Sequence, residues 1–199
     1  MYAFLPSPDI AFAETNYVYW ENGFSDDDIK EIIKIGENLE LSDATVGSDT
    51  PQGIVDEKIR TSKISWIHYN QNSDFLFNKL AYIARSLNGQ FFGFDLYGFG
   101  EPMQYTVYHS EDNNHYDWHM DKGMKNHSPR KLSMILQLSD PDEYEGGDLE
   151  IFVSNETIKL EKRKGLVWAF PSYVMHRVTP VTKGIRKSLV VWITGPKFR

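Results

Sequence analysis

The sequence contains no cysteine, and this absence excludes several classes of protein. A chain without thiols cannot form disulfides, thiolate zinc sites or iron–sulfur clusters, and it has no need of an oxidising compartment. It also lacks any run of about 18 or more apolar residues that could span a bilayer. Residues 1–6 do not show the basic and then apolar pattern of a secretory signal. We therefore expect a cytoplasmic protein that does not enter a membrane.

Basic residues are in the minority, with 21 Lys and Arg against 28 Asp and Glu, which gives a net charge of −7. A negative chain repels phosphate backbones, so we predict that nucleic acid is not a partner. The one basic cluster, residues 159–164, is interpreted as a solvated hairpin. There is no internal repeat. The length of 199 residues suits one hydrophobic core, which predicts a single domain over residues 1–199. The oligomeric state does not follow from the sequence.

The most specific local pattern is His-Tyr-Asp-Trp-His-Met-Asp at residues 115–121. On a strand, His119 and Asp121 project to the same side, at a separation that allows both to bind one metal ion. His176, on a distant strand, would complete a set of two nitrogens and one oxygen. Such a set covers one face of an octahedral ion and suits non-haem iron(II) in an oxygenase, whereas zinc more often takes a closed tetrahedral site.

A second pair with the same spacing, His115 and Asp117, lies immediately upstream. On an extended strand all four side chains of the two pairs share one face, so the pattern alone cannot choose between them. A polar loop without any metal is the alternative interpretation of either pair.

Arg186 begins a strand that follows a turn at Thr182, Lys183 and Gly184. Alternation places Ser188, Val190 and Trp192 on the same face as Arg186. A guanidinium beside a hydroxyl is suited to bind a carboxylate with two hydrogen bonds. If Arg186 points inward it needs a protein carboxylate or a bound acid as its partner. The alternative is a surface arginine that follows a turn.

These residues carry a resemblance to a known family. The chain resembles the prolyl-4-hydroxylase-like branch of the iron(II)/2-oxoglutarate-dependent dioxygenases, which includes bacterial hydroxylases and the oxygen-sensing prolyl hydroxylases of animals. The similarity covers residues 25–195 approximately. Its motifs are the Tyr108, Tyr116 and His119-x-Asp121 spacing, the acidic turn and Gly-Gly-x-Leu of residues 138–149, residues 164–172, His176 with Arg186, and the early strand at residues 59–67.

The resemblance assigns roles to individual residues. It implies that His119, Asp121 and His176 hold iron(II), in preference to the upstream pair. It also implies that Arg186 binds the distal carboxylate of 2-oxoglutarate. Four further residues are cosubstrate candidates: Ser188 or Thr179 as helpers of Arg186, Tyr108 as a donor to the chelating end, and Gln137 where some relatives carry a tyrosine that contacts the distal carboxylate.

The implied activity is hydroxylation of a C–H bond with 2-oxoglutarate and dioxygen as cosubstrates and with release of succinate and carbon dioxide. Ascorbate is a candidate additional cofactor. A prolyl residue in a protein or peptide is the preferred substrate, because the similarity extends to residues 59–67, outside the shared barrel. The alternatives are a free amino acid or other small metabolite, a nucleobase, and a metal-binding module without activity. Arg60 and Trp118 are candidates for substrate contacts, and residues 46–58 are a candidate flap over the substrate.

The expected architecture is α+β and mainly β. Ser25, followed by Asp26, Asp27 and Asp28, predicts the start of one helix, and apolar spacing predicts a second helix from Ser73 to about Asn88. From residue 91 onward, short strands and turns predict a double-stranded β-helix (jelly-roll) that the N-terminal helices support. We thus expect residues 1–90 to supply helices and early strands, and residues 91–195 to form the catalytic barrel.

Overall fold

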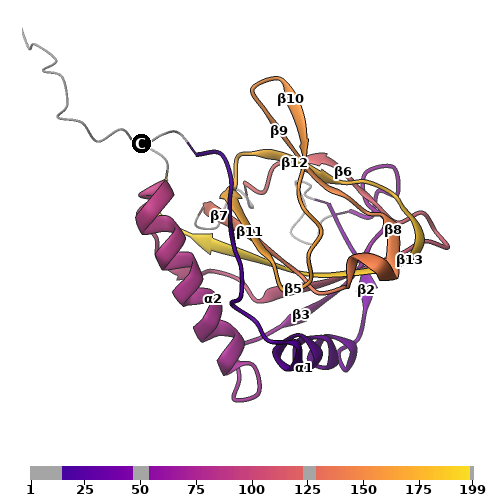
Figure 1. Cartoon of the computed structure of the whole chain (residues 1–199), viewed down its shortest axis with the longest axis horizontal. Coiled ribbons are helices and arrows are strands. Elements are labelled where there is room, and N and C mark those ends of the chain that lie inside the picture. Colours follow the sequence, from indigo (N-terminus) through magenta and orange to yellow (C-terminus); the bar gives the residue numbers. More distant parts are fainter. Residues whose placement is uncertain (1–14, 47–53, 123–128, 198–199) are drawn as a thin grey trace, which may run out of the picture.

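The computed structural model describes residues 15–46, 54–122 and 129–197. Two antiparallel sheets are covered on one side by two helices, α1 (Asp26–Glu37) and α2 (Asp74–Leu87) (Figure 1). The large sheet has nine strands in the order β1-β11-β7-β13-β5-β3-β2, and β4 and β8 also pair with β13. The small sheet has the order β10-β9-β12-β6. The mainly β architecture with few helices is therefore confirmed.

The strands of the large sheet are β1 (Val18–Trp20), β2 (Ser42–Asp43), β3 (Lys63–Ile67), β4 (Gly98–Phe99), β5 (Met103–His109), β7 (Arg130–Gln137), β8 (Tyr144–Gly146), β11 (Val167–Pro171) and β13 (Val181–Thr194). Those of the small sheet are β6 (Tyr116–His119), β9 (Leu149–Val153), β10 (Glu156–Lys159) and β12 (Met175–Val178). A π-helical turn, Asn88–Phe92, continues α2, and a 3-10 turn, Pro141–Glu143, precedes β8.

Helix α1 begins as the acidic tripeptide predicts. The Ser25 hydroxyl accepts a hydrogen bond from the Asp28 amide, and the Asp28 carboxylate accepts one in return from the Ser25 amide, which forms a capping box. The helix then packs closely on the large sheet. A Cβ atom on Gly36 would lie 2.4 Å from the ring of Tyr105, so only glycine allows this approach.

The two faces of the large sheet contact different layers. Alternate residues of β5, β7 and β13 pack in the core that contains both helices, and the residues between them face the small sheet. On the helix side these are Met103, Tyr105, Val107, Leu132, Met134, Leu136, Leu189, Val191 and Ile193. On the other side, Tyr108, Ile135 and Val190 join the core that contains Ile151 and Val178 of the small sheet.

Some expected boundaries differ in the structure. Residues 91 and 92 belong to the π-helical turn, which ends at Gly93 with a left-handed φ of 64°, so the strands that follow α2 begin at β4. The early strands β1, β2 and β3 join the same large sheet as the later ones. Residues 47–53, most of the candidate flap, lie outside the described residues.

In the described ranges, no helix has the length and apolar character needed to cross a membrane.

Candidate metal centre and its cavity

Three candidate ligands come together where β6 and β12 pair. His119 and His176 are direct partners in the antiparallel register, and Asp121 follows two residues after His119. The Nε2 atom of His119 lies 3.7 Å from Oδ1 of Asp121, and the Nε2 atom of His176 lies 3.4 Å from Oδ2 of Asp121. One ligand atom from each residue lies within 4.8 Å of the other two, so a single ion could contact all three.

Backbone carbonyls fix the orientation of both imidazole rings. The Nδ1 atom of His119 lies 2.7 Å from the carbonyl oxygen of Asp117, and that of His176 lies 2.9 Å from the carbonyl oxygen of Val174. A carbonyl can only accept, so each Nδ1 carries the proton and donates it. When such a ring is neutral, its lone pair lies on Nε2, which faces Asp121. This is the arrangement that metal-binding histidines use.

The carboxylate of Asp121 is buried and is held by two serines. Its Oδ2 atom accepts a hydrogen bond of 2.8 Å from the Ser133 hydroxyl, which lies 2.9 Å from the hydroxyl of Ser172. The Asp121 amide donates to the backbone carbonyl of Ser172. These contacts join the end of the small sheet to β7 and β11 of the large sheet. The position of the carboxylate is thus set by both layers.

The electrostatics of the cluster favour a cation between the three side chains. Burial, and then the neighbouring His176, lower the pKa of His119 to about 3, so this ring is neutral and able to bind a metal. Burial alone would raise the pKa of Asp121, but the charge of His176 lowers it below its ordinary value. Burial alone would lower the pKa of His176, but the charge of Asp121 raises it. An ionised carboxylate therefore lies between the two imidazoles.

The upstream pair does not join this group. The Nδ1 atom of His115 lies 3.2 Å from the Thr61 hydroxyl, and its Nε2 atom lies 3.4 Å from the carbonyl oxygen of Lys58. The carboxylate of Asp117 is exposed and accepts from the amide of Trp118. Of the four residues that the sequence pattern could not separate, the structure places His119 and Asp121 in the cluster.

Arg186 lies in the same cavity as the three candidate ligands. Its side chain is only 2% exposed, its Nη1 donates to the Ser188 hydroxyl at 3.2 Å, and its guanidinium carbon lies 5.2 Å from the ring centre of Tyr108. Within the described residues, no carboxylate pairs with it. A buried guanidinium without an anion is costly, so this position suits a ligand that carries an acid group.

Two residues near Arg186 were not singled out from the sequence. Gly147 has a left-handed φ of 58°, and a Cβ atom there would lie 3.0 Å from Cδ of Arg186, so the glycine leaves room for the arginine stem. The hydroxyl of Tyr144 accepts a hydrogen bond of 2.7 Å from Gln137 and also hydrogen-bonds Arg186. Gln137 therefore contacts the arginine through Tyr144. The only sequence signal was that both residues lie in the acidic, glycine-rich turn.

The remaining candidates divide into two groups. Arg60 lines the cavity together with the ligands, and so does Trp192, which was expected only to share a face with Arg186. Thr179 does not line it, because its hydroxyl accepts from the amide of Asp148. Trp118 also lies outside the cavity lining: the guanidinium of Arg177 stacks on its ring, 4.7 Å from the centre.

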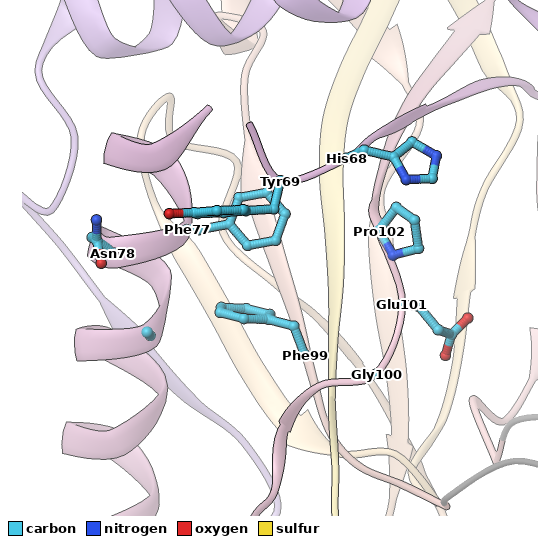
Figure 2. Close-up of a pocket in the computed structure, with 9 residues that line it drawn as sticks. His68, Tyr69, Phe77, Asn78, Phe99, Gly100, Glu101 and Pro102 are labelled. Carbon is cyan, nitrogen blue, oxygen red and sulfur yellow. The ribbon is translucent and has the colours of Figure 1, made fainter. Parts of the chain in front are cut away.

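A more voluminous cleft, of about 470 Å³, lies between α2 and the strands β3 and β4. Figure 2 shows the rings of Tyr69, Phe77 and Phe99 gathered on one side of it, and His68, Glu101 and Pro102 on the other. Tyr69 and Phe99 each make an edge contact with Phe77. Among the described residues, no group of three or more metal-binding side chains lies in this cleft, so the larger volume does not identify the metal site.

Comparison with known proteins agrees with this site. Residues 103–194 match the sequence model of the 2OG-Fe(II) oxygenase superfamily. A PKHD-type hydroxylase of Synechococcus sp. (strain CC9311) is 37% identical over 90 residues, which are 45% of this chain and 41% of that protein. One from Xylella fastidiosa (strain 9a5c) is 33% identical over 102 residues, 46% of this chain and 44% of that protein. The chain thus spans less than half the length of these relatives.

Solved structures show the same fold. A Pseudomonas putida prolyl-4-hydroxylase superposes with a TM-score of 0.73 at 20% identity, covering 94% of this chain and 96% of that one. A prolyl hydroxylase of Trichoplax adhaerens, in complex with a hypoxia inducible factor peptide fragment, gives a TM-score of 0.75 at 17% identity over 90% and 84% of the two chains.

All three candidate ligands, Arg186 and the cavity-facing residues of β5, β7 and β13 lie within the matched segment. The resemblance inferred from the sequence motifs is confirmed: residues 103–194 match the 2OG-Fe(II) oxygenase superfamily, PKHD-type hydroxylases are similar in sequence, and a prolyl-4-hydroxylase has the same fold.

Proposed function

We propose that this protein is an iron(II)- and 2-oxoglutarate-dependent dioxygenase that hydroxylates a C–H bond. One observation carries the proposal: two imidazole Nε2 atoms and one carboxylate converge in a cavity that also holds a buried arginine without a carboxylate partner among the described residues. The first group fits iron(II), and the second fits the distal carboxylate of 2-oxoglutarate. We also propose that the chain is one domain and that its two sheets form a double-stranded β-helix.

Each residue has a defined task in this proposal. His119, Asp121 and His176 bind iron(II), which when present supplies the activation of dioxygen and the oxidative decarboxylation of 2-oxoglutarate to succinate and carbon dioxide. Arg186 binds the far end of the cosubstrate, supported by Ser188. Tyr108 borders the same space from β5 and is a donor to the cosubstrate. The apolar side chains Ile135 and Val190 exclude water from the reacting atoms.

The proposed substrate is a prolyl residue in a protein or peptide. The sequence motif of residues 59–67 supports this choice, as does the fold shared with prolyl hydroxylases, one of which was solved with a peptide. Arg60, from this motif, lines the cavity and is the substrate contact that we retain. One fold can carry many substrates. A free amino acid or small metabolite is the rival substrate.

The first experiment tests the iron and cosubstrate site. The protein is mixed with iron(II) and 2-oxoglutarate without oxygen, and we expect a weak visible charge-transfer band. Admission of air should then convert 2-oxoglutarate into succinate. If both the band and succinate are absent, the protein is a metal-binding module without activity. Arg177→Ala serves as a control variant that should give the same band and the same succinate as the wild-type protein, because Arg177 lies outside the cavity and pairs with Glu150.

The second experiment identifies the substrate class. The iron-loaded protein is incubated with 2-oxoglutarate, air and proline-containing peptides, and the products are analysed by mass spectrometry. We expect a gain of one oxygen atom on a prolyl residue. Succinate release without any oxygen gain on the peptides would direct the search to free amino acids and small acids.

A further inference from the structure

Arg60 is a second buried arginine in the cavity. Arg60 precedes β3 in the chain and is 6% exposed. Its side chain contacts the neighbouring strand β5. Its Nε donates to the Ser62 hydroxyl at 2.7 Å, and its Nη2 donates to the side-chain oxygen of Gln104 at 2.8 Å. Its guanidinium carbon lies 4.4 Å from the ring centre of Tyr116. All three contacts are with uncharged groups.

Other half-buried arginines of the chain have anionic partners. Arg130 makes two hydrogen bonds to Glu101, one of them 2.6 Å long, and Arg177 pairs with Glu150 at 2.7 Å. In the described part of the chain, Arg60 and Arg186 have no carboxylate partner, and both line the cavity of the metal centre. Neutral hydrogen bonds do not repay the removal of a guanidinium from water. The two buried arginines without a carboxylate partner among the described residues therefore both lie where a ligand would bind.

Arg60 retains donors for such a ligand. A guanidinium has five N–H groups, and the two hydrogen bonds within the described residues use two of them, which leaves three. The contact with Tyr116 places it near the centre, because the ring of Tyr116 stacks on that of His119 with 3.5 Å between the ring centres. The partner of Arg60 would thus lie next to the iron ligands.

The two unpaired arginines are held at different places. Arg186 is the register partner of Tyr108 on β5, whereas Arg60 is bonded to Gln104 on the same strand. These anchors are four positions apart on β5, which is roughly 13 Å along a strand. In the proposed function Arg186 is occupied by 2-oxoglutarate. Arg60 is then left for a second acid group.

We propose that Arg60 binds a carboxylate of the substrate and holds it beside the iron ligands. This inference rests on the proposed function and narrows its substrate class to compounds that carry an acid group near the hydroxylated carbon. Two sources share this chemistry: the α-carboxylate of a free amino acid, and an acidic side chain next to a prolyl residue in a peptide. An arginine suits either one, because its planar donors match the two carboxylate oxygens.

The test compares acids with their amides on the complete protein, loaded with iron(II) and 2-oxoglutarate without oxygen. The small-molecule pair is L-proline and L-prolinamide. The peptide pair is N-acetyl-Pro-Asp-amide and N-acetyl-Pro-Asn-amide. Affinity is measured by calorimetry. We expect one acid to bind at least about tenfold more tightly than its amide, as a charge-assisted contact requires. The pair that discriminates identifies the source of the carboxylate.

Variants assign the discrimination to Arg60. In Arg60→Gln, the acid should lose its advantage over the amide, and in Arg60→Lys the advantage should be intermediate, because lysine keeps the charge without the two-pronged geometry. Lys63→Gln is the matched control: it removes a nearby cation that is bonded to Asp43 on the surface, and it should keep the full discrimination. Arg60→Lys also keeps the test valid if Arg60→Gln does not fold.

Three results would overturn the inference. One is that neither acid binds more tightly than its amide to the wild-type protein. Another is that the discrimination persists in Arg60→Gln. The third is that Arg60→Gln weakens 2-oxoglutarate as strongly as the acid, which would place Arg60 in the cosubstrate site. A protein that binds no iron or 2-oxoglutarate at all would refute the proposed function, whereas loss of acid preference alone refutes only the role of Arg60.

Discussion

The two faces of the large sheet are built from the same strands but carry different side chains: one face packs in an apolar core, and the other lines the cavity. On the helix side, Leu189 of β13 and Leu136 of β7 are fully buried in an apolar core. On the cavity side, the neighbouring residues Ser188 and Gln137 are also buried but are polar, and they lie near a guanidinium without a carboxylate partner among the described residues. At these positions burial is similar on the two faces, and only the chemistry of the side chains differs.

This difference separates stability from function along one strand. The helix face requires apolar volume, and many side chains supply it. The cavity face requires particular donors and acceptors, and it holds buried charges that reduce stability unless a ligand pairs with them. Substitutions of adjacent residues should consequently change different properties, and the following predictions test this separation in order of expected effect.

The largest effect is expected at the metal ligands. His176→Ala or Asp121→Ala should abolish iron(II) binding and succinate formation, because each removes one of three ligands. His115→Ala, which removes an imidazole hydrogen-bonded to Thr61, should retain iron. Iron content after gel filtration and succinate formation measure the outcome. Loss of iron in His115→Ala with retention in Asp121→Ala would mean that the upstream pair binds the metal.

A smaller effect is expected at Arg186. Arg186→Ala should weaken the binding of 2-oxoglutarate by about 2 to 5 kcal/mol, which is the cost of losing one side of a buried charged contact, and it should change the affinity for iron much less. The control Arg177→Ala removes an arginine that is paired with Glu150 outside the cavity. Calorimetric titration of the iron-loaded protein measures both affinities. Equal losses of iron and 2-oxoglutarate would show that Arg186 is structural.

The sequence predicted the residues whose role depends on local spacing. His119 and Asp121 lie two apart near the end of a strand, so short-range geometry marks them as one of two candidate pairs, and the capping box of α1 follows from residues three apart. The choice between the two His-x-Asp pairs needed the family resemblance, because all four side chains share a face of an ideal strand. In the structure β6 ends at His119, and His115 lies before it.

Contacts between distant segments could not be predicted in this way. The hydrogen bond from Ser133 to Asp121 and the link from Gln137 through Tyr144 to Arg186 depend on how β7 packs against the small sheet and the acidic turn. Thr179 was a candidate for Arg186 from its position in the sequence. Its hydroxyl instead accepts from Asp148, a partner that only the fold brings near.

On the helix face, Leu189→Ala should reduce the free energy of unfolding without changing ligand binding. The side chain is fully buried, and truncation of such a leucine costs about 2 to 5 kcal/mol through lost contacts and a remaining cavity. Chemical denaturation measures the loss, and iron titration of the folded variant should give the wild-type affinity. A large fall in iron affinity would show that the two faces of β13 are coupled.

The smallest effect is expected when the same substitution, serine to alanine, is made on each face of the large sheet. Ser133→Ala removes the hydroxyl that orients Asp121, and loss of such a supporting hydrogen bond should lower iron affinity by about tenfold. Ser65→Ala removes an equally buried hydroxyl, which donates to the Gly36 carbonyl on the helix side, and should leave iron affinity unchanged. Competition with a metal chelator measures both variants. Equal affinities in the two variants would mean that the hydrogen bond from Ser133 to Asp121 does not contribute to iron binding.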